Sequence, residues 1–171
     1  MLRQGHIGVS LVLSSAVVYA AGKMDMLFVG IYFCSVLIFT EGLPDLDTSV
    51  PFVTHRGITH TLWFAIAVSI ISGVIGGGTV LYLAETAIWE SIPVEVSPLT
   101  VGIVTGLGGG LGIISHLLGD LITPWGIEPF VPLSDRKVRV KLTTASNTTV
   151  NAAVFLSGVV LSGAALVVSS G

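Results

Sequence analysis

The residues best suited to chemistry in this chain are histidines and aspartates that occur in short, spaced groups. His116 and Asp120 are four residues apart, and on a helix this spacing places both side chains on one face. Their sequence neighbours are apolar, and ionisable groups at membrane depth are costly unless they are paired. The pair is therefore a candidate functional site. A His–Asp hydrogen bond that only joins two helices explains it equally well.

Two further groups lie earlier in the chain. Asp45 and Asp47 follow an apolar run, and two such carboxylates can bind a cation, although aspartate also caps helices and forms turns. His55 and His60 are five apart and do not share a face of a regular helix. We expect one in a loop and one on the first turn of the next helix, with Gly57 supplying the bend. Imidazole together with carboxylate favours Zn, Mn or Fe over Ca or Mg alone.

Other polar residues flank these groups. The planar guanidinium of Arg56 suits a phosphate or a carboxylate, although a surface arginine that obeys the positive-inside rule is nearly as good an explanation. A basic run begins at Arg136 and is typical of contact with anionic lipid headgroups. Thr59 is placed to cap the next helix. Asn147 and Asn151, another pair four residues apart, can reach the same region from the last apolar segment.

The composition indicates a membrane protein. Of the 171 residues, 52% are hydrophobic and 10% are charged, whereas an ordinary soluble domain carries about 25% charged residues. Mean hydropathy is +0.94. A net charge of −3 argues against a nucleic-acid partner, whose binding surface would be broadly basic. Cys34, the single cysteine, cannot form an internal disulfide.

We predict an all-α fold, a single integral-membrane domain over residues 1–171 built as a polytopic bundle of about five transmembrane helices. The apolar segments lie at about 7–22, 25–40, 59–83, 99–122 and 148–170. The first two are separated only by residues 22–25, which predicts a tight helical hairpin. Gly102, Gly106 and Gly110 recur every four residues and predict a helix face that admits a neighbouring backbone.

Charge asymmetry predicts how the spans are oriented. Counting five spans places six of the seven cationic residues on the N-terminal side and only Lys23 on the other, where the acidic loop 84–98 also lies. The positive-inside rule then puts the N-terminus in the cytoplasm and the C-terminus outside, with every histidine at the cytoplasmic interface. The first span also resembles a secretory signal peptide, whose cleavage would remove His6 and leave the other spans oriented as before.

Taken together, these motifs resemble the YdjM-like family of membrane-bound, metal-dependent hydrolases, also described as LexA-binding, inner-membrane-associated hydrolases. The resemblance rests on Pro44-Asp45-Leu46-Asp47, on the segment from His55 to His60, and on His116-x3-Asp120-x2-Thr123-x2-Gly126, and it covers residues 6 to about 140. It implies a multi-span helical protein with a His/Asp centre for one or two divalent ions, with zinc ahead of manganese, iron or magnesium. The candidate ligands that it carries over are His6, Asp45, Asp47, His55, His60, His116 and Asp120.

The predicted activity is hydrolysis of a phosphoester or ester bond in a lipid or amphipathic substrate at the bilayer surface. Glu41, or a non-ligating aspartate such as Asp47, would take a proton from water. Arg56, assisted by Arg136, would bind the substrate and stabilise its negative charge. Two alternatives remain open, a regulatory metal-binding membrane protein and a divalent-metal transporter. A transporter would need charged groups throughout the spans, whereas the outer halves of the third and fourth spans offer Gly, Ser and Thr but no acidic residue or histidine.

Overall fold

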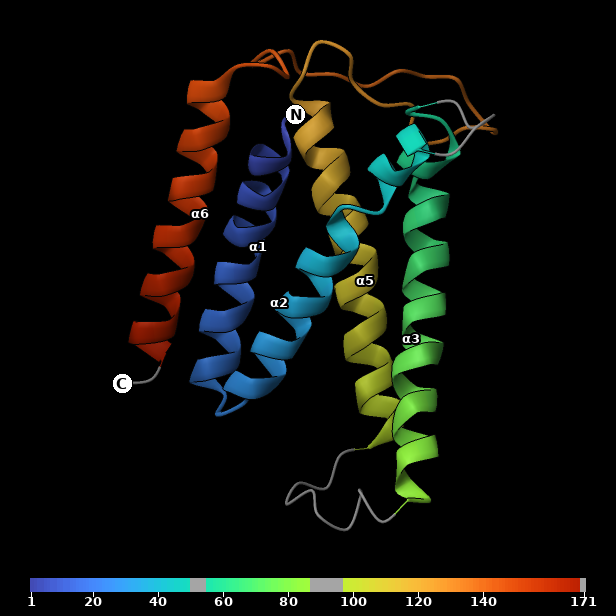
Figure 1. Ribbon diagram of the computed structural model, residues 1–171, viewed down its shortest axis with the longest axis vertical. Helices are drawn as coiled ribbons and strands as arrows, with labels where there is room; N and C mark the ends of the chain where they lie inside the picture. The colour runs from blue at the N-terminus through green and yellow to red at the C-terminus, as the bar shows by residue number, and fades with distance from the viewer. Residues whose placement is uncertain (50–54, 87–96, 170–171) are drawn as a thin grey trace.

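The computed structural model describes residues 1–49, 55–86 and 97–169 and shows an all-helical chain in this part (Figure 1). The long helices are α1 (Arg3–Lys23), α2 (Leu27–Glu41), α3 (Leu62–Ala84), α5 (Pro98–Leu121) and α6 (Thr148–Ser169). Two short 3-10 helices, η1 (Pro44–Ser49) and η2 (Ile58–His60), connect α2 to α3. The described residues contain no strand, only an isolated bridge between Ile127 and Val138. The predicted fold class is confirmed.

Five helical segments are long and apolar enough to cross a membrane, as predicted. The first two form the predicted hairpin, in which Asp25 adopts a left-handed backbone. The second span is counted from Leu27 to Ser49, so it comprises α2 and the continuing turn η1. The 15 residues of α2 alone extend only about 22 Å at roughly 1.5 Å per residue.

The helices pack as two pairs joined by α2. α3 lies along α5 and α1 lies along α6, while α2 contacts both α1 and α5 (Figure 1). One apolar cluster lies between α1, α2 and α6 and includes Phe33 and Leu37. A second lies between α3 and α5 and includes Ala65 and Ile113.

Glycines allow the close approach of α3 and α5. A Cβ atom built on Gly106 would lie 2.8 Å from the backbone oxygen of Ser69, and one on Gly102 would lie 3.1 Å from the backbone oxygen of Gly73. Any larger side chain at Gly106 would have to push the backbone of α3 away. The predicted role of this glycine face in helix packing is confirmed.

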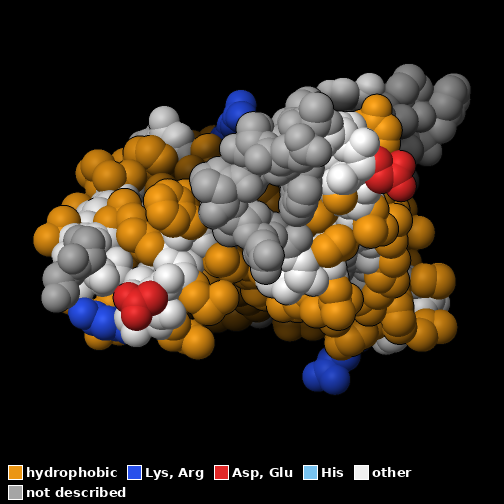
Figure 2. All heavy atoms as spheres, turned by 90° about the horizontal axis from the view of Figure 1, so that it is seen from below, with side chains coloured by type: hydrophobic (Ala, Val, Ile, Leu, Met, Phe, Trp, Pro, Cys, Tyr) orange, Lys and Arg blue, Asp and Glu red, His pale blue; other side chains and the backbone are white. Residues whose placement is uncertain are grey.

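The outside of the bundle is apolar, as expected for a surface that faces lipid. Large side chains such as Phe28, Phe39 and Ile70 are exposed along the helices. The view from below shows hydrophobic side chains over most of the visible surface, with few charged ones (Figure 2). Most of the acidic loop 84–98 lies outside the described residues.

One end of this bundle carries the polar residues. The N-terminal turns of α1 and α3, the C-terminal turn of α5 and the turns η1 and η2 meet there (Figure 1). Segments that are distant in sequence are therefore brought to one place by helix packing.

Candidate metal centre

All seven predicted ligands come together at this end of the bundle. Three groups of three side chains each offer donor atoms that lie within 4.8 Å of one another. The groups are His6 with Asp45 and His116; Asp45 with His55 and His60; and His60 with His116 and Asp120. Asp47 contacts two of these histidines.

Four donor atoms from His60, His116, Asp45 and Asp120 are linked by separations of less than 4 Å between each histidine and each aspartate, and we call them the four-donor centre. His60 Nε2 lies 3.7 Å from Asp45 Oδ1 and 3.6 Å from Asp120 Oδ2. His116 Nε2 lies 3.4 Å from Asp45 Oδ1 and 3.9 Å from Asp120 Oδ2. These separations are too long for good hydrogen bonds. They are close to the roughly 3.3–3.6 Å between neighbouring ligands of a tetrahedral ion with bonds of about 2.0–2.2 Å.

The burial of these groups also fits a metal ion. His60 and His116 are fully buried, and neither Nε2 has a hydrogen-bond partner among the described residues. Buried polar atoms are costly without a partner, and a cation between these nitrogens and the facing carboxylates would satisfy them. Asp120 is also buried, whereas the side chain of Asp45 is 47% exposed. The centre is therefore closed on the α5 side and open beside η1.

Asp47 accepts hydrogen bonds with both of its oxygens and is buried. Its Oδ1 lies 2.7 Å from His55 Nδ1, and its Oδ2 accepts from the Thr59 hydroxyl at 2.7 Å and from the Arg56 backbone N–H at 3.2 Å. A carboxylate occupied in this way orients histidines that bind a metal through their other ring nitrogen. The sequence predicts Asp47 as a metal ligand or as a proton acceptor, whereas its contacts favour a third role, that of a carboxylate that orients histidines.

Thr59 determines which nitrogen of His60 carries a proton. The only hydroxyl proton of Thr59 is donated to Asp47, so Thr59 Oγ1 accepts a hydrogen bond from His60 Nδ1, 3.0 Å away. The Nε2 atom of His60 then has a free lone pair, directed at Asp45 and Asp120. The prediction that Thr59 caps the next helix is wrong. Thr61 is the cap, and its Oγ1 accepts from the Phe64 backbone N–H at 3.2 Å.

Arg56 fixes Asp120 from the loop before η2. Its guanidinium donates to Asp120 Oδ1 at 2.7 Å and to the backbone oxygen of Gly126 at 3.2 Å. The left-handed backbone in this loop falls on Arg56, at a φ of 63°, and the predicted bend follows at Gly57, with φ −83° and ψ −132°. This turn directs the arginine toward α5 and brings its charge beside the centre.

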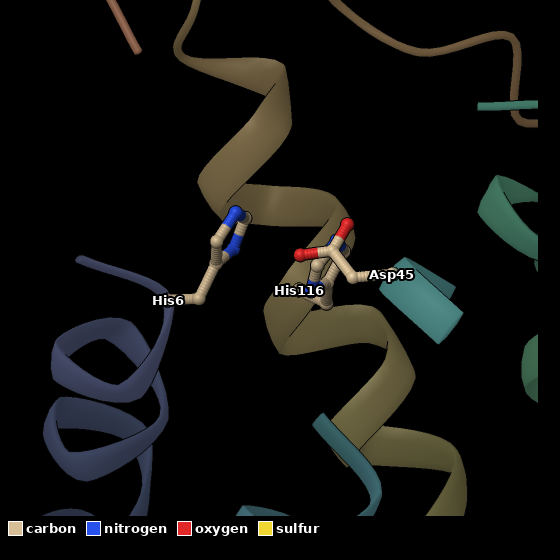
Figure 3. Close-up of side chains that lie close together, drawn as sticks. All are labelled: His6, Asp45 and His116. Carbon is tan, nitrogen blue, oxygen red and sulfur yellow. The ribbon is translucent and has the colours of Figure 1, made fainter. Parts of the chain in front are cut away.

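His6 reaches the centre from α1. Its ring stacks on that of His116, with centroids 4.0 Å apart (Figure 3). The Met1 α-amine lies 2.9 Å from His6 Nε2 and donates to Asp120 Oδ1 at 2.8 Å. Asn151 of α6 accepts from the Leu2 backbone N–H at 3.1 Å and holds this end of α1 in place. The sequence placed Asn151 in this region but gave no indication of the Met1 contact.

The two remaining predicted residues differ in position. Glu41 is buried, and its Oε1 lies 3.6 Å from His116 Nδ1, on the edge of the ring away from the four-donor centre. Arg136 is exposed on the loop after α5, where its backbone N–H bonds to Ser134. Within the described ranges, no recorded contact joins the Arg136 side chain to the centre.

The fold and the site define a multi-pass membrane protein with a His/Asp cluster, compatible with metal binding, buried at one end of its bundle. A model of the YdjM inner membrane protein family matches residues 1–170, and the chain belongs to this family. The resemblance seen in the motifs is confirmed. The chain has no significant match among curated proteins and none among solved structures.

Proposed function

We propose that this protein is a membrane-embedded hydrolase that depends on a divalent metal ion. The observation that carries the proposal is the four-donor centre, in which the unpartnered Nε2 atoms of His60 and His116 face the carboxylates of Asp45 and Asp120. Two imidazoles and two carboxylates suit zinc first, then manganese or iron, and magnesium last.

The exposed side chain of Asp45 favours chemistry over a purely structural role. Structural zinc sites are closed, whereas catalytic sites keep one position open to water or substrate. When bound, a divalent ion acts as a Lewis acid toward water and toward a substrate oxygen. The open side beside η1 is where both can approach.

The surrounding residues have separate roles in this proposal. Asp47 and Thr59 keep the His60 Nε2 lone pair directed at the centre. The Glu41 carboxylate lies 3.6 Å from His116 Nδ1, too far for a hydrogen bond, and its negative charge favours a proton on that nitrogen over Nε2, which leaves Nε2 free to bind. Arg56 holds Asp120 and contributes a positive charge, which favours an anionic substrate such as a phosphoester.

The proposed substrate is a lipid or another amphipathic molecule. The described loop beyond α5 exposes apolar side chains, Trp125 and Leu133, next to the basic segment that contains Arg136 and Arg139. This mixture suits the headgroup region of a bilayer. By the positive-inside rule that region belongs to the cytoplasmic leaflet, so a lipid would reach the centre laterally.

The proposal is tested by metal-dependent turnover in purified protein. The chain is reconstituted in lipid nanodiscs, stripped with a chelator and assayed on anionic phospholipid and on a chromogenic phosphodiester, with and without Zn²⁺ or Mn²⁺. Hydrolysis should require the metal and fall by at least about 100-fold in His60→Ala and Asp45→Ala. Thr79→Val, exposed on α3 away from the centre, is the matched control. Activity that persists without metal or in both variants overturns the proposal.

A second candidate is a regulatory membrane protein that holds the metal without chemistry. The exposed basic segment 136–141 favours it, because such a segment can dock a cytoplasmic partner. Tightly bound metal in protein that turns over neither substrate would support this candidate.

A further inference from the structure

We propose that the substrate is a phosphoester lipid with a long hydrocarbon chain, whose far end lies in an apolar pocket between α2, α3 and α5. This inference rests on the proposed function and specifies its substrate. The pocket has a volume of about 600 Å³, and we call it the tail pocket. Its lining includes residues of all three helices, namely Phe28 and Tyr32 of α2, Ile75 and Thr79 of α3, and Val101 and Thr105 of α5.

Three hydroxyl groups of the tail pocket already donate their protons within the protein. The Thr105 hydroxyl donates to the backbone oxygen of Val101 at 2.7 Å. The Thr79 hydroxyl donates to the backbone oxygen of Ile75 at 2.8 Å. Tyr32 Oη lies 2.7 Å from Thr105 Oγ1, whose proton is used, so Tyr32 is the donor of that hydrogen bond. With these donors occupied, the pocket suits a hydrocarbon chain better than a polar group.

The tail pocket lies on the same side of α5 as the open side of the four-donor centre. Among the described residues, α2 and α3 each pack on α5 but make almost no contact with one another. They lie on either side of α5 and diverge with distance from η1 (Figure 1). The turn η1, which carries Asp45, follows α2 and leads through η2 to α3. The open side beside η1 and the tail pocket therefore both belong to the side of α5 that α2 and α3 flank.

One exposed face of α2 leads from η1 to the tail pocket. Its residues follow the helical repeat and are Phe28, Tyr32, Ser35 and Phe39. All four are exposed, Phe28 to 89% and Phe39 to 79%. Phe39 lies in the last turn of α2, next to η1, whereas Phe28 and Tyr32 line the pocket. The Ser35 hydroxyl donates to a backbone oxygen one turn earlier, at 2.9 Å. A hydrocarbon chain can therefore follow this face without meeting an unused donor.

The depth of the tail pocket sets the length of the chain. At roughly 1.5 Å per residue, α5 extends about 16 Å from His116 to Thr105 and about 22 Å from His116 to Val101. One leaflet contributes only about 15 Å, half of a hydrocarbon core about 30 Å thick. A chain from the centre to the pocket therefore crosses the bilayer midplane. At about 1.1–1.2 Å per bond in an extended chain, it has about 20 carbon atoms or more.

Photo-crosslinking tests where the chain ends, without any need for turnover. An alkyl phosphate of about 20 carbon atoms, with a diazirine on its last carbon, is added to the Zn²⁺-loaded full chain in nanodiscs. Mass spectrometry should find the label on the residues of α2, α3 and α5 that line the tail pocket. Removal of Zn²⁺ should reduce this labelling by about tenfold, because the headgroup then loses its anchor. Labelling of α1 and α6 instead overturns the proposal. Pocket labelling that does not depend on Zn²⁺ also overturns it, because the occupant is then an ordinary bilayer lipid.

Chain-length preference tests the same inference by turnover. Two chromogenic esters, alkyl p-nitrophenyl phosphates with about 8 and about 20 alkyl carbons, are compared in nanodiscs. The wild type should favour the long ester in kcat/KM by about fivefold, because contacts in the pocket replace looser contacts with lipid chains. Ile75→Trp fills the pocket and should abolish this preference without changing turnover of the short ester. Val74→Trp is the matched control, since Val74 is exposed on the same helix but lines a groove on the other face of α3 and α5. The same preference in both variants overturns the proposal.

The two measurements separate the tail pocket from the hydrolase. Zn²⁺-dependent turnover of both esters without a chain-length preference would overturn the tail pocket and leave the hydrolase proposal intact. Zn²⁺-dependent labelling of the pocket without turnover of either ester would reject the hydrolase and support the pocket as the site of the chain.

Discussion

The two halves of α5 have opposite chemistry. Its N-terminal half contacts α3 through Gly102 and Gly106, with backbone atoms in close approach. Its C-terminal half carries His116 and Asp120, whose ring nitrogens and Oδ2 face one another without hydrogen bonds. The N-terminal half of α5 therefore contributes to helix packing, and its C-terminal half contributes residues to the candidate site. The packed half holds the polar half in a conformation that costs free energy when no cation is present.

Polar side chains of both neighbouring helices approach the middle of α5. The Thr40 hydroxyl of α2 lies 3.2 Å from the backbone oxygen of Gly109, and the Ser72 hydroxyl of α3 lies 3.2 Å from that of Thr105. The single proton of each hydroxyl has a closer acceptor in its own helix, at 2.9 Å and 2.6 Å, so these contacts show close packing of α2 and α3 on α5 below the centre. Their ends, η1 and η2, bring Asp45 and His60 to His116 from this fixed base.

The largest effect is expected from breaking the packed half. Gly106→Leu would force α5 away from the backbone of Ser69, with a loss of about 3 kcal/mol in the free energy of unfolding and a loss of metal binding with it. Gly78→Leu on α3 is the matched control, because a Cβ at Gly78 meets nothing within 4 Å. Thermal unfolding in detergent measures both. Equal stability of the two variants would contradict the claim that the N-terminal half of α5 stabilises the fold by packing on α3.

Breaking the polar half should remove function and spare the fold. His116→Leu deletes two buried nitrogens that have no hydrogen-bond partner, so the metal-free protein should unfold within about 1 kcal/mol of the wild type. Binding of Zn²⁺ at the four-donor centre should be lost. Calorimetric titration with unfolding curves of the chelated proteins checks both statements. A collapse of the metal-free fold would show that His116 is structural.

A smaller effect should distinguish Asp47 from the ligands. Asp47→Asn leaves the four-donor centre intact but weakens the orientation of His55 and His60, so Zn²⁺ affinity should fall by about 10–100-fold without being abolished. Asp135→Asn, an exposed aspartate on the loop after α5, should leave it unchanged. Competition with a chromophoric chelator measures both affinities. Complete loss of binding in Asp47→Asn would make Asp47 a ligand.

The smallest effect is expected on the exposed loop. Lys137 lies 3.2 Å from Glu128, and both side chains are largely solvent-accessible. Exposed ion pairs of this kind contribute roughly 0–1 kcal/mol. Lys137→Ala should therefore change the free energy of unfolding by no more than about 0.5 kcal/mol. It should leave the Zn²⁺ affinity unchanged. A clear loss of Zn²⁺ affinity would show that this loop contributes to the four-donor centre.

The sequence predicted the spans and the residues of the cluster because both depend on local patterns. Apolar runs of membrane length appear as helices, and the motifs around Asp45, His60 and His116 converge at one end. The different roles of Asp45 and Asp47 were not predictable. They are two residues apart in one turn, and only the positions of Thr59 and the Arg56 backbone show that Asp47 is already occupied.

Contacts between distant segments account for the features of the site that the sequence did not predict. The sequence suggested Arg56 as a substrate ligand, whereas its guanidinium binds Asp120, 64 residues away. The bend at Gly57 was predicted, whereas the left-handed backbone of the preceding Arg56 was not. Thr59 does not cap the next helix because α3 begins only at Leu62, directly after its N-cap Thr61.

The shortness of α2 has a consequence for where a membrane substrate would be met. A hydrocarbon core about 30 Å thick exceeds the roughly 22 Å length of α2, so the turn η1 completes the span. A span completed by η1 would place Asp45 below the headgroups, where the bilayer would have to thin or admit water to solvate that carboxylate. The scissile bond of a lipid just under the bilayer surface would then lie at the same depth as the metal ion, while the acyl chains remained in the hydrocarbon core.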